Sequence, residues 1–195
     1  LAVINLPLDY AVQFTITPTA APGGWGNIIH FTADGGNCCA YGQRIPGVWF
    51  YGGTTRLHIR DGSQADGNHG CDPEEQLPLN QATTVRIQMI QGGVETMYNG
   101  ISKCTATGRS RANFNDISVY ASDPWFEAAA GSLQNLQVIA MDSSDDLVPG
   151  AVYLTASNMQ LVRGTELQTV DLPFDYTLGM TITPRGFVGE WANII

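Results

Sequence analysis

A repeat at a constant offset of 166 residues sets the size of the unit into which this chain can fold. Residues 6–29 read LPLDYAVQFTITPTAAPGGWGNII and residues 172–195 read LPFDYTLGMTITPRGFVGEWANII, so that 13 of 24 positions are identical. Self-similarity at a fixed period marks a repeated structural unit. We therefore expect one module over 1–150, a linker or first strand of the next copy over 151–166, and the start of a second module over 167–195.

The second copy stops inside a segment that continues as an apolar strand in the first copy. A sheet left half unpaired exposes strand edges and apolar surface, which folded proteins avoid. We expect the chain to be a segment of a longer array, or its terminal strands to complete the sheet of a neighbouring copy. The positions expected to serve this assembly are Leu6, Tyr10, Leu172, Tyr176 and Trp191.

Composition and charge narrow the possible partners. The chain is 44% hydrophobic and only 14% charged, with 22 glycines, which favours turn-rich β structure. A net charge of -9 with 9 basic residues excludes nucleic acid as a partner, because such binding needs clustered Lys and Arg. No apolar run approaches the roughly 20 residues that span a bilayer, so we expect no membrane insertion.

Short alternating or β-branched segments recur between turn residues, as in a β sandwich. The clearest hairpin is predicted through Gly92-Gly93, and Asn99-Gly100 is a strong type I′ turn dipeptide. Strands are predicted at 10–17, 27–32, 48–51, 55–60, 83–91, 94–99, 116–121, 132–141, 152–154 and 160–162.

Three segments resemble the closing half of laminin G-like and concanavalin A-like jelly rolls. They read TTVRI at 83–87, VETMYNG at 94–100 and GSLQNLQV at 131–138. In that family an aromatic-Asn-Gly turn precedes a last strand of the form G-x-[IL]-x-N-[LV]. The resemblance implies an all-β, two-sheet antiparallel jelly-roll sandwich, here followed by the first strands of a second copy. It also implies extracellular placement and a role in adhesion, lectin-like sugar binding or architecture, among which the fold alone does not choose.

Four cysteines, Cys38, Cys39, Cys71 and Cys104, are even in number and lack the C-x-x-C spacing of zinc or redox motifs. Two disulfides formed in an extracellular, oxidising compartment are predicted, with free buried thiols as the alternative. A bridge between the two neighbours is expected to be strained, and strand alternation would point their side chains apart. Each neighbour is therefore expected to pair with either Cys71 or Cys104.

The loop over 61–75 is rich in oxygen-bearing side chains and glycines. Calcium takes 6 to 8 oxygen ligands, and a loop of this kind can supply them. The loop lacks the EF-hand pattern, so a solvated, turn-rich loop is the alternative. No cofactor is required, and calcium is the one candidate, with possible ligands at Asp61, Asp66, Asn68, Asp72 and Glu75.

The adjacent aromatics Trp49, Phe50 and Tyr51 must send at least one ring away from the core if they form a strand. Sugar rings stack on exposed aromatic faces, so Trp49 and Tyr51 are candidate glycan-stacking residues. Trp25 and Trp191 occupy the same position in the repeat, and packing is the role expected of them.

No catalytic site is predicted. The spacing Glu-x-Asp-x-x-Glu of glycosidases on this fold is missing, and Glu74-Glu75 lies in a predicted loop. The histidines follow no H-E-x-x-H pattern, and no serine lies in a G-x-S-x-G elbow.

The leading hypothesis is a non-enzymatic structural repeat unit of an extracellular filament, cell-surface hair or adhesive array. Its partner would be itself, through contacts between repeats or through strand complementation. The alternative is a lectin-like, glycan-binding module, with or without calcium, whose repeats supply multivalency.

Overall fold

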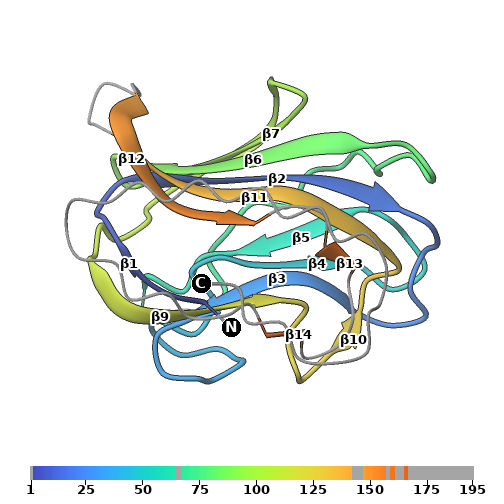
Figure 1. The fold of residues 1–195 in the computed structure, drawn as a ribbon, viewed down its shortest axis with the longest axis horizontal. Coiled ribbons are helices and arrows are strands. Elements are labelled where there is room, and N and C mark those ends of the chain that lie inside the picture. Colours follow the sequence, from blue (N-terminus) through green and yellow to red (C-terminus); the bar gives the residue numbers. More distant parts are fainter. Residues whose placement is uncertain (1, 65–66, 142–146, 157–158, 161–164, 167–195) are drawn as a thin grey trace, which may run out of the picture.

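The computed structural model describes residues 2–64, 67–141, 147–156, 159–160 and 165–166, and it describes side chains over 4–64 and 67–141 (Figure 1). None of these residues forms a helix long and apolar enough to cross a membrane. Each of the ten predicted segments overlaps a strand. The strands are β1 Ala2–Leu6, β2 Tyr10–Pro18, β3 Gly26–Thr32, β4 Gly47–Phe50, β5 Leu57–Arg60, β6 Thr83–Ile90, β7 Gly93–Tyr98, β8 Ile101–Thr107, β9 Phe114–Ala121, β10 Glu127–Ala128, β11 Gly131–Met141, β12 Leu147–Ala156, β13 Met159–Gln160 and β14 Thr165–Glu166.

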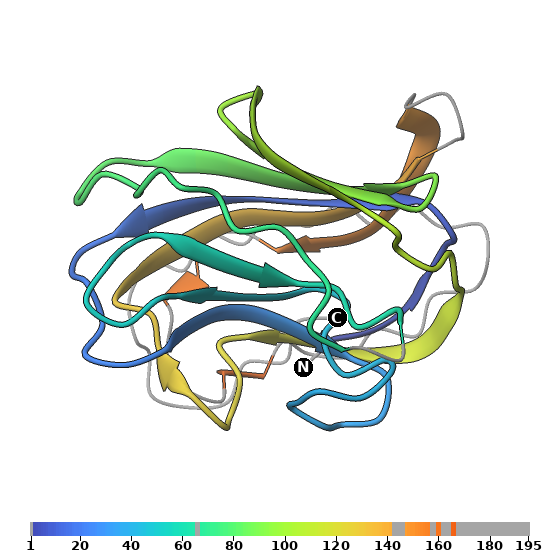
Figure 2. The same cartoon turned by 180° about the vertical axis from the view of Figure 1, so that it is seen from behind.

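The strands form two sheets of seven strands that pack face to face, as Figures 1 and 2 show. The first sheet has the order β1-β9-β3-β4-β5, with β10 on β3 and β14 on β9. The second has the order β12-β11-β2-β6-β7-β8, with β13 on β11. Neighbouring strands along both orders are antiparallel, while β10 runs parallel to β3. The predicted two-sheet antiparallel sandwich is therefore confirmed.

Two tight turns join β6, β7 and β8. Asn99 and Gly100 have φ angles of 51° and 80°, which is the pattern of the predicted type I′ turn. Gln91 and Gly92 have φ angles of 50° and 82°, and Ile90 pairs with Gly93. The first turn therefore lies one residue earlier than the predicted Gly92-Gly93.

Alternate side chains of both sheets meet in one hydrophobic core, which includes Phe14, Phe31 and Phe50. Leu6 is 2% exposed and Tyr10 is fully buried, and the Tyr10 hydroxyl donates to the carbonyl oxygen of Ile45 at 3.1 Å. These two side chains, which we expected to contact a neighbouring copy, instead fill the core of their own module, because β1 pairs with β9 and β2 lies between β11 and β6. The other three expected assembly positions, Leu172, Tyr176 and Trp191, lie outside the described residues.

Four strands were not predicted, namely β1, β8, β10 and β14. β8 is the edge strand of its sheet, and Ile101 at its start is 63% exposed. Because little of β8 is buried on either face, its sequence does not alternate between apolar and polar residues. That alternation is the signal from which a strand is predicted, so β8 could not be predicted from the sequence.

The segment after residue 150 also contributes to the two sheets. β12 crosses the expected boundary and pairs with β11, and β14 pairs with β9, the strand that also pairs with β1. The division of the chain at residues 150 and 166 stays a prediction.

Candidate functional site

The first sheet has an aromatic and polar outer face, set by alternation along β4 and β5. Val48 and Phe50 belong to the core cluster, whereas Trp49, between them, does not. Trp49 pairs in register with His58, so both side chains lie on the face away from the second sheet. At least one ring of the aromatic trio was predicted to leave the core, and two do, Trp49 and Tyr51.

Trp49 is nevertheless only 2% exposed, because neighbouring side chains cover it. The rings of His30 and Phe126 lie 5.3 and 5.7 Å from its ring, and the Arg44 guanidinium lies 4.8 Å from it. Trp49 therefore cannot present an open stacking surface, and it serves as the floor of the site.

Gly47 leaves room for the Trp49 ring. A Cβ built at Gly47 would collide with the indole, although Gly47 itself is not in the left-handed region. The position of Trp49 thus depends on the absence of a side chain two residues earlier.

A pocket of about 260 Å³ lies over this outer face. At its rim Trp25 is 40% exposed, and its ring lies 4.8 Å from that of Tyr51 and 4.7 Å from that of His58. Packing was the role expected of Trp25, and its ring does pack on Tyr51 and His58. The ring is partly exposed all the same, because Trp25 lies in the loop before β3 and not on a strand that faces the core. The pocket is lined by Trp25, Cys38, Cys39, Arg44, Trp49, His58, Asn68 and Phe126.

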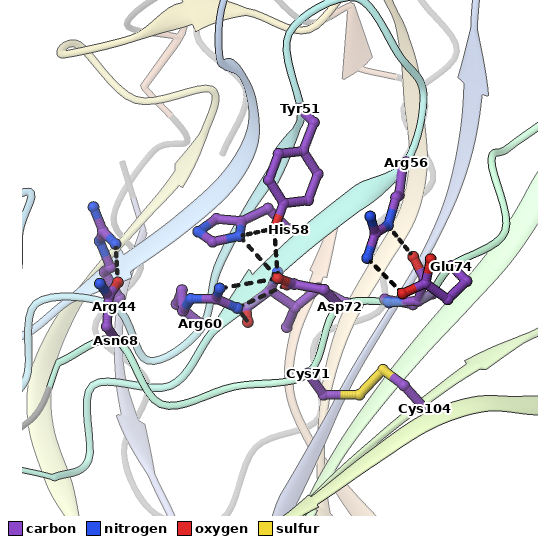
Figure 3. A network of polar contacts seen from close by, with 12 residues as sticks. Arg44, Tyr51, Arg56, His58, Arg60, Asn68, Cys71, Asp72, Glu74 and Cys104 are labelled. Carbon is purple, nitrogen blue, oxygen red and sulfur yellow. Dashed lines mark hydrogen bonds and ion pairs between the residues drawn. A yellow bond between two sulfur atoms is a disulfide. The ribbon is translucent and has the colours of Figure 1, made fainter.

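Asp72 organises one side of the site, as Figure 3 shows. Its carboxylate accepts hydrogen bonds from the Tyr51 hydroxyl at 2.6 Å, from the Arg60 guanidinium at 2.7 and 2.9 Å, and from the Ile59 amide at 3.0 Å. The His58 Nδ1 atom lies 3.3 Å from the same carboxylate. Asp72 therefore fixes the orientation of Tyr51 and His58, the two rings that support Trp25.

The environment sets the charges of this network. Burial acts to raise the pKa of Asp72, but the hydrogen bonds from His58, Arg60, Tyr51 and the backbone together hold that pKa well below its usual range. Burial lowers the pKa of His58, and the hydrogen bond with Asp72 offsets this effect only in part. At neutral pH the Asp72 carboxylate is charged and the His58 ring is neutral.

His58 is expected to make the module less stable below about pH 6.5, the ordinary pKa of histidine. The pKa of His58 is lower in the folded chain than in the unfolded chain, so at acidic pH the unfolded chain binds a proton that the folded chain does not. The free energy of unfolding therefore decreases as the pH is lowered, by at most about 1.4 kcal/mol per pH unit. Asp72, whose folded pKa is also lowered, adds its loss only below about pH 4. Urea unfolding of the unaltered protein and of His58→Gln between pH 7.5 and 5 checks this. The substitution should flatten the slope, and parallel slopes would contradict the assignment.

Arg44 holds the loops on the opposite side of the pocket. It is 7% exposed, its Nε donates to the carbonyl oxygen of Asn37 at 3.0 Å, and its Nη1 donates to the side-chain oxygen of Asn68 at 3.0 Å (Figure 3). Burial lowers the pKa of Arg44, nearby Arg60 acts in the same direction, and the charge of Asp123 acts to raise it. These bonds tie the loop before β4 to the loop after β5.

A buried pair positions the third wall. His30 Nδ1 lies 2.8 Å from the Asp123 carboxylate, and His30 Nε2 lies 2.6 Å from the carbonyl oxygen of Gln43. Asp123 also accepts the backbone N–H groups of Trp125 and Phe126 at 3.1 and 2.8 Å. The turn that brings Phe126 to the pocket is thereby anchored on β3.

The four candidate calcium ligands that the structure describes do not converge. Asp61 is fully buried beside Arg109 at 3.2 Å, Asn68 accepts from Arg44, and Glu75 contacts Lys103. Asp72 faces the network described above, and Asp66 lies outside the described residues. Within the part of the chain that the structure describes, no three His, Cys, Asp or Glu side chains gather as metal ligands. Calcium binding stays a prediction, and these contacts give it no support.

All four cysteines form disulfides, but with a different connectivity from the one expected. Cys38 pairs with Cys39, and Cys71 pairs with Cys104 with a Cα–Cα separation of 5.9 Å. The expectation that the neighbours pair with distant cysteines was wrong, because Cys38 and Cys39 lie in an irregular loop, where strand alternation does not apply. Both neighbours line the pocket.

Trp25, Arg44 and Phe126 are site residues that sequence reasoning missed. A tryptophan between glycines, in GGWG at 23–26, indicates an exposed ring in a turn. Arg44 and Phe126 carry no such local signal, because bonds to residues distant in the sequence position their loops.

These features define a class of fold, an all-β jelly-roll sandwich of two sheets, with an aromatic pocket on the outer face of one sheet. No family model and no curated protein matches the sequence. The fold is similar to that of a heptameric SAP-like pentraxin from Limulus polyphemus, with a TM-score of 0.52 and 12% identity over 84% of this chain and 87% of that one. It is also similar to a putative carbohydrate binding protein from Bacteroides ovatus, with a TM-score of 0.52 and 12% identity over 76% of this chain and 45% of that one. This chain therefore spans less than half of the Bacteroides protein, and at these identities the likeness shows the fold alone.

Proposed function

We propose that the module binds carbohydrate through the pocket at whose rim Trp25 lies. The observation that carries the proposal is the exposed Trp25 ring, which Tyr51 and His58 hold in place beside the pocket. Aromatic rings offer large apolar faces at low entropic cost, and the C–H faces of sugar rings stack on such surfaces.

The make-up of the pocket supports the same function. Ligand sites are mostly apolar, with a few placed polar groups, and here Trp49 and Phe126 lie beside His58, Asn68 and Arg44. Its volume of about 260 Å³ falls just below the roughly 300–1,000 Å³ of drug-sized sites, which suits one saccharide unit of a longer chain. The description of the Bacteroides protein as a putative carbohydrate binding protein fits this use of the fold.

The two disulfides favour an extracellular or otherwise oxidising location, where such bonds persist. Binding without catalysis is proposed, since no catalytic arrangement was predicted from the sequence. The absence of enzymatic activity stays a prediction.

Trp25→Ala is expected to weaken saccharide binding by about thirtyfold, since truncating a well-placed tryptophan commonly costs about 2 kcal/mol or more. Binding to a panel of oligosaccharides, measured by isothermal titration calorimetry, checks this. Tyr41→Ala is the matched control, because Tyr41 is 54% exposed and does not line the pocket. Equal losses in both variants, or no saccharide bound by the unaltered protein, would overturn the proposed function.

The array hypothesis from the repeat stays a prediction beside this one. Thr165 pairs with Ala121 on β9, and Ala2 pairs with Val119 on the same strand. Residues that lie about one period apart in the sequence therefore pair with the same strand, β9. Repeated modules would give a glycan-binding chain multivalency.

A further inference from the structure

We propose that the pocket selects saccharides that carry an oxyanion substituent, either the carboxylate of a uronic acid or a sulfate ester, and that Arg44 binds this group. The inference rests on the proposed function and names its ligand class. Both ligand types share one chemistry, a delocalised negative charge on two or more oxygen atoms.

The first observation is a buried cation without an anion in contact. Of the six arginines whose side chains the structure describes, four pair with a carboxylate within 4.0 Å, and Arg44 and Arg86 do not. Of these two, Arg44 is the buried one and the one that lines the pocket. Its hydrogen-bond partners, the Asn37 carbonyl oxygen and the Asn68 side-chain oxygen, are neutral. The charge of Asp123 acts to raise the pKa of Arg44, but Asp123 is bonded to His30 and does not contact the guanidinium. A buried charge is costly unless it is paired, so the Arg44 guanidinium favours an anionic partner from outside the module. The four paired arginines are Arg56, Arg60, Arg109 and Arg111.

The second observation is the charge of the lining. Two of the described residues that line the pocket can carry a positive charge, Arg44 and His58. Burial lowers the pKa of His58, so Arg44 is the charged one at neutral pH. The Asp72 carboxylate, which is the nearest acidic partner of His58, is itself occupied by Arg60. A single positive charge among aromatic walls acts through a low local dielectric, where it attracts an anion more strongly than it would in water.

The third observation is the geometry of the donors. A guanidinium has five N–H donors in a planar fork, and the Nε and Nη1 atoms of Arg44 donate to Asn37 and Asn68 respectively. The remaining donors suit an oxyanion, which arginine binds in a bidentate manner. Trp25 and Arg44 line the same pocket, so a sugar ring on the tryptophan can direct its charged substituent to the arginine.

The net negative charge of the chain means that any preference for an acidic sugar has to arise within the pocket. At -9, the protein as a whole repels polyanions, so the preference for an acidic sugar comes from short-range pairing and not from the long-range field. The preference should therefore appear with short oligosaccharides.

A matched series of ligands tests the inference on the unaltered protein. The series comprises a trigalacturonate, the same trisaccharide with its carboxyl groups reduced to alcohols, and the reduced form carrying 6-O-sulfate esters. Calorimetry is expected to show at least about tenfold tighter binding of an anionic ligand than of the neutral one, since charge-assisted hydrogen bonds are roughly twice as strong as neutral ones. The tighter of the two anionic ligands identifies the substituent.

Two variants separate the roles of the residues. Arg44→Gln should abolish the difference between anionic and neutral ligands, while Trp25→Ala should weaken all three. Equal affinity of the unaltered protein for the neutral and both anionic ligands would overturn the inference and leave the proposed function standing. Failure of all three ligands to bind would overturn the inference, and failure of the whole oligosaccharide panel would overturn the proposed function as well. If Arg44→Gln does not fold, the ligand series with the unaltered protein decides alone.

Discussion

Replacing Asp61 by asparagine is expected to lower the free energy of unfolding by about 3–5 kcal/mol. The side chains of Asp61 and Arg109 are fully buried and lie 3.2 Å apart, and Arg109 also donates to the Leu8 carbonyl oxygen at 3.1 Å. Burial raises the pKa of Asp61 in spite of the neighbouring guanidinium, which indicates how costly this carboxylate is to desolvate. A neutral amide at this position would leave the arginine as an uncompensated buried charge.

Thermal unfolding measures this effect. For a module of this size, the loss corresponds to a fall in Tm of roughly 6–20 °C. The exposed pair of Arg56 and Glu74 supplies the control, because Glu74→Gln removes an ion pair at the surface and should shift Tm by about 2 °C or less. Equal shifts in Asp61→Asn and Glu74→Gln would show that the Asp61–Arg109 pair does not carry a buried charge.

An apolar replacement of both partners separates charge from packing. Asp61→Leu combined with Arg109→Met removes the two charges together, and such replacements are often neutral or stabilising. The double variant should therefore be more stable than Asp61→Asn. This role also explains why Asp61, a predicted calcium ligand, faces inward: an acidic residue in a turn-rich loop can be bound to an arginine 48 positions along the chain as readily as to a cation.

The sheets could be predicted from the sequence because their signal is local. Apolar residues alternate with polar ones along β2, β6 and β7, and one buried face is enough to produce that pattern. The Asn99-Gly100 turn was predictable for the same reason, since both residues tolerate positive φ. β8, an edge strand with little buried surface, has no such pattern.

The site was less predictable, because loops from distant parts of the chain build it. Trp49 could be assigned to the outer face by alternation, but its cover by Arg44 and Phe126 depends on contacts between loops. The exposed ring belongs instead to Trp25, whose place in the repeat indicated packing. Tyr51 was a candidate stacking residue, and the structure shows it as the support on which Trp25 rests.

Removing the Cys71–Cys104 disulfide is expected to lower the free energy of unfolding by about 2–4 kcal/mol. The bond joins residues separated by 33 positions and links the loop that carries Asp72 to the edge strand β8. In the chain-entropy account, a cross-link stabilises by restricting the unfolded chain, and more so when the loop is longer. Urea unfolding of the double variant Cys71→Ser and Cys104→Ser under non-reducing conditions measures the loss.

The second disulfide provides an internal control. Cys38 and Cys39 are adjacent and exposed, so their bond closes no loop of consequence in the unfolded chain. The double variant Cys38→Ser and Cys39→Ser should therefore change the free energy of unfolding by only about 0.5 kcal/mol. Its effect should appear in saccharide affinity, because both residues line the pocket. Equal losses of unfolding free energy in the two double variants would show that the Cys71–Cys104 bond does not stabilise the module through loop closure. They would also show that the adjacent pair stabilises the fold in addition to lining the pocket.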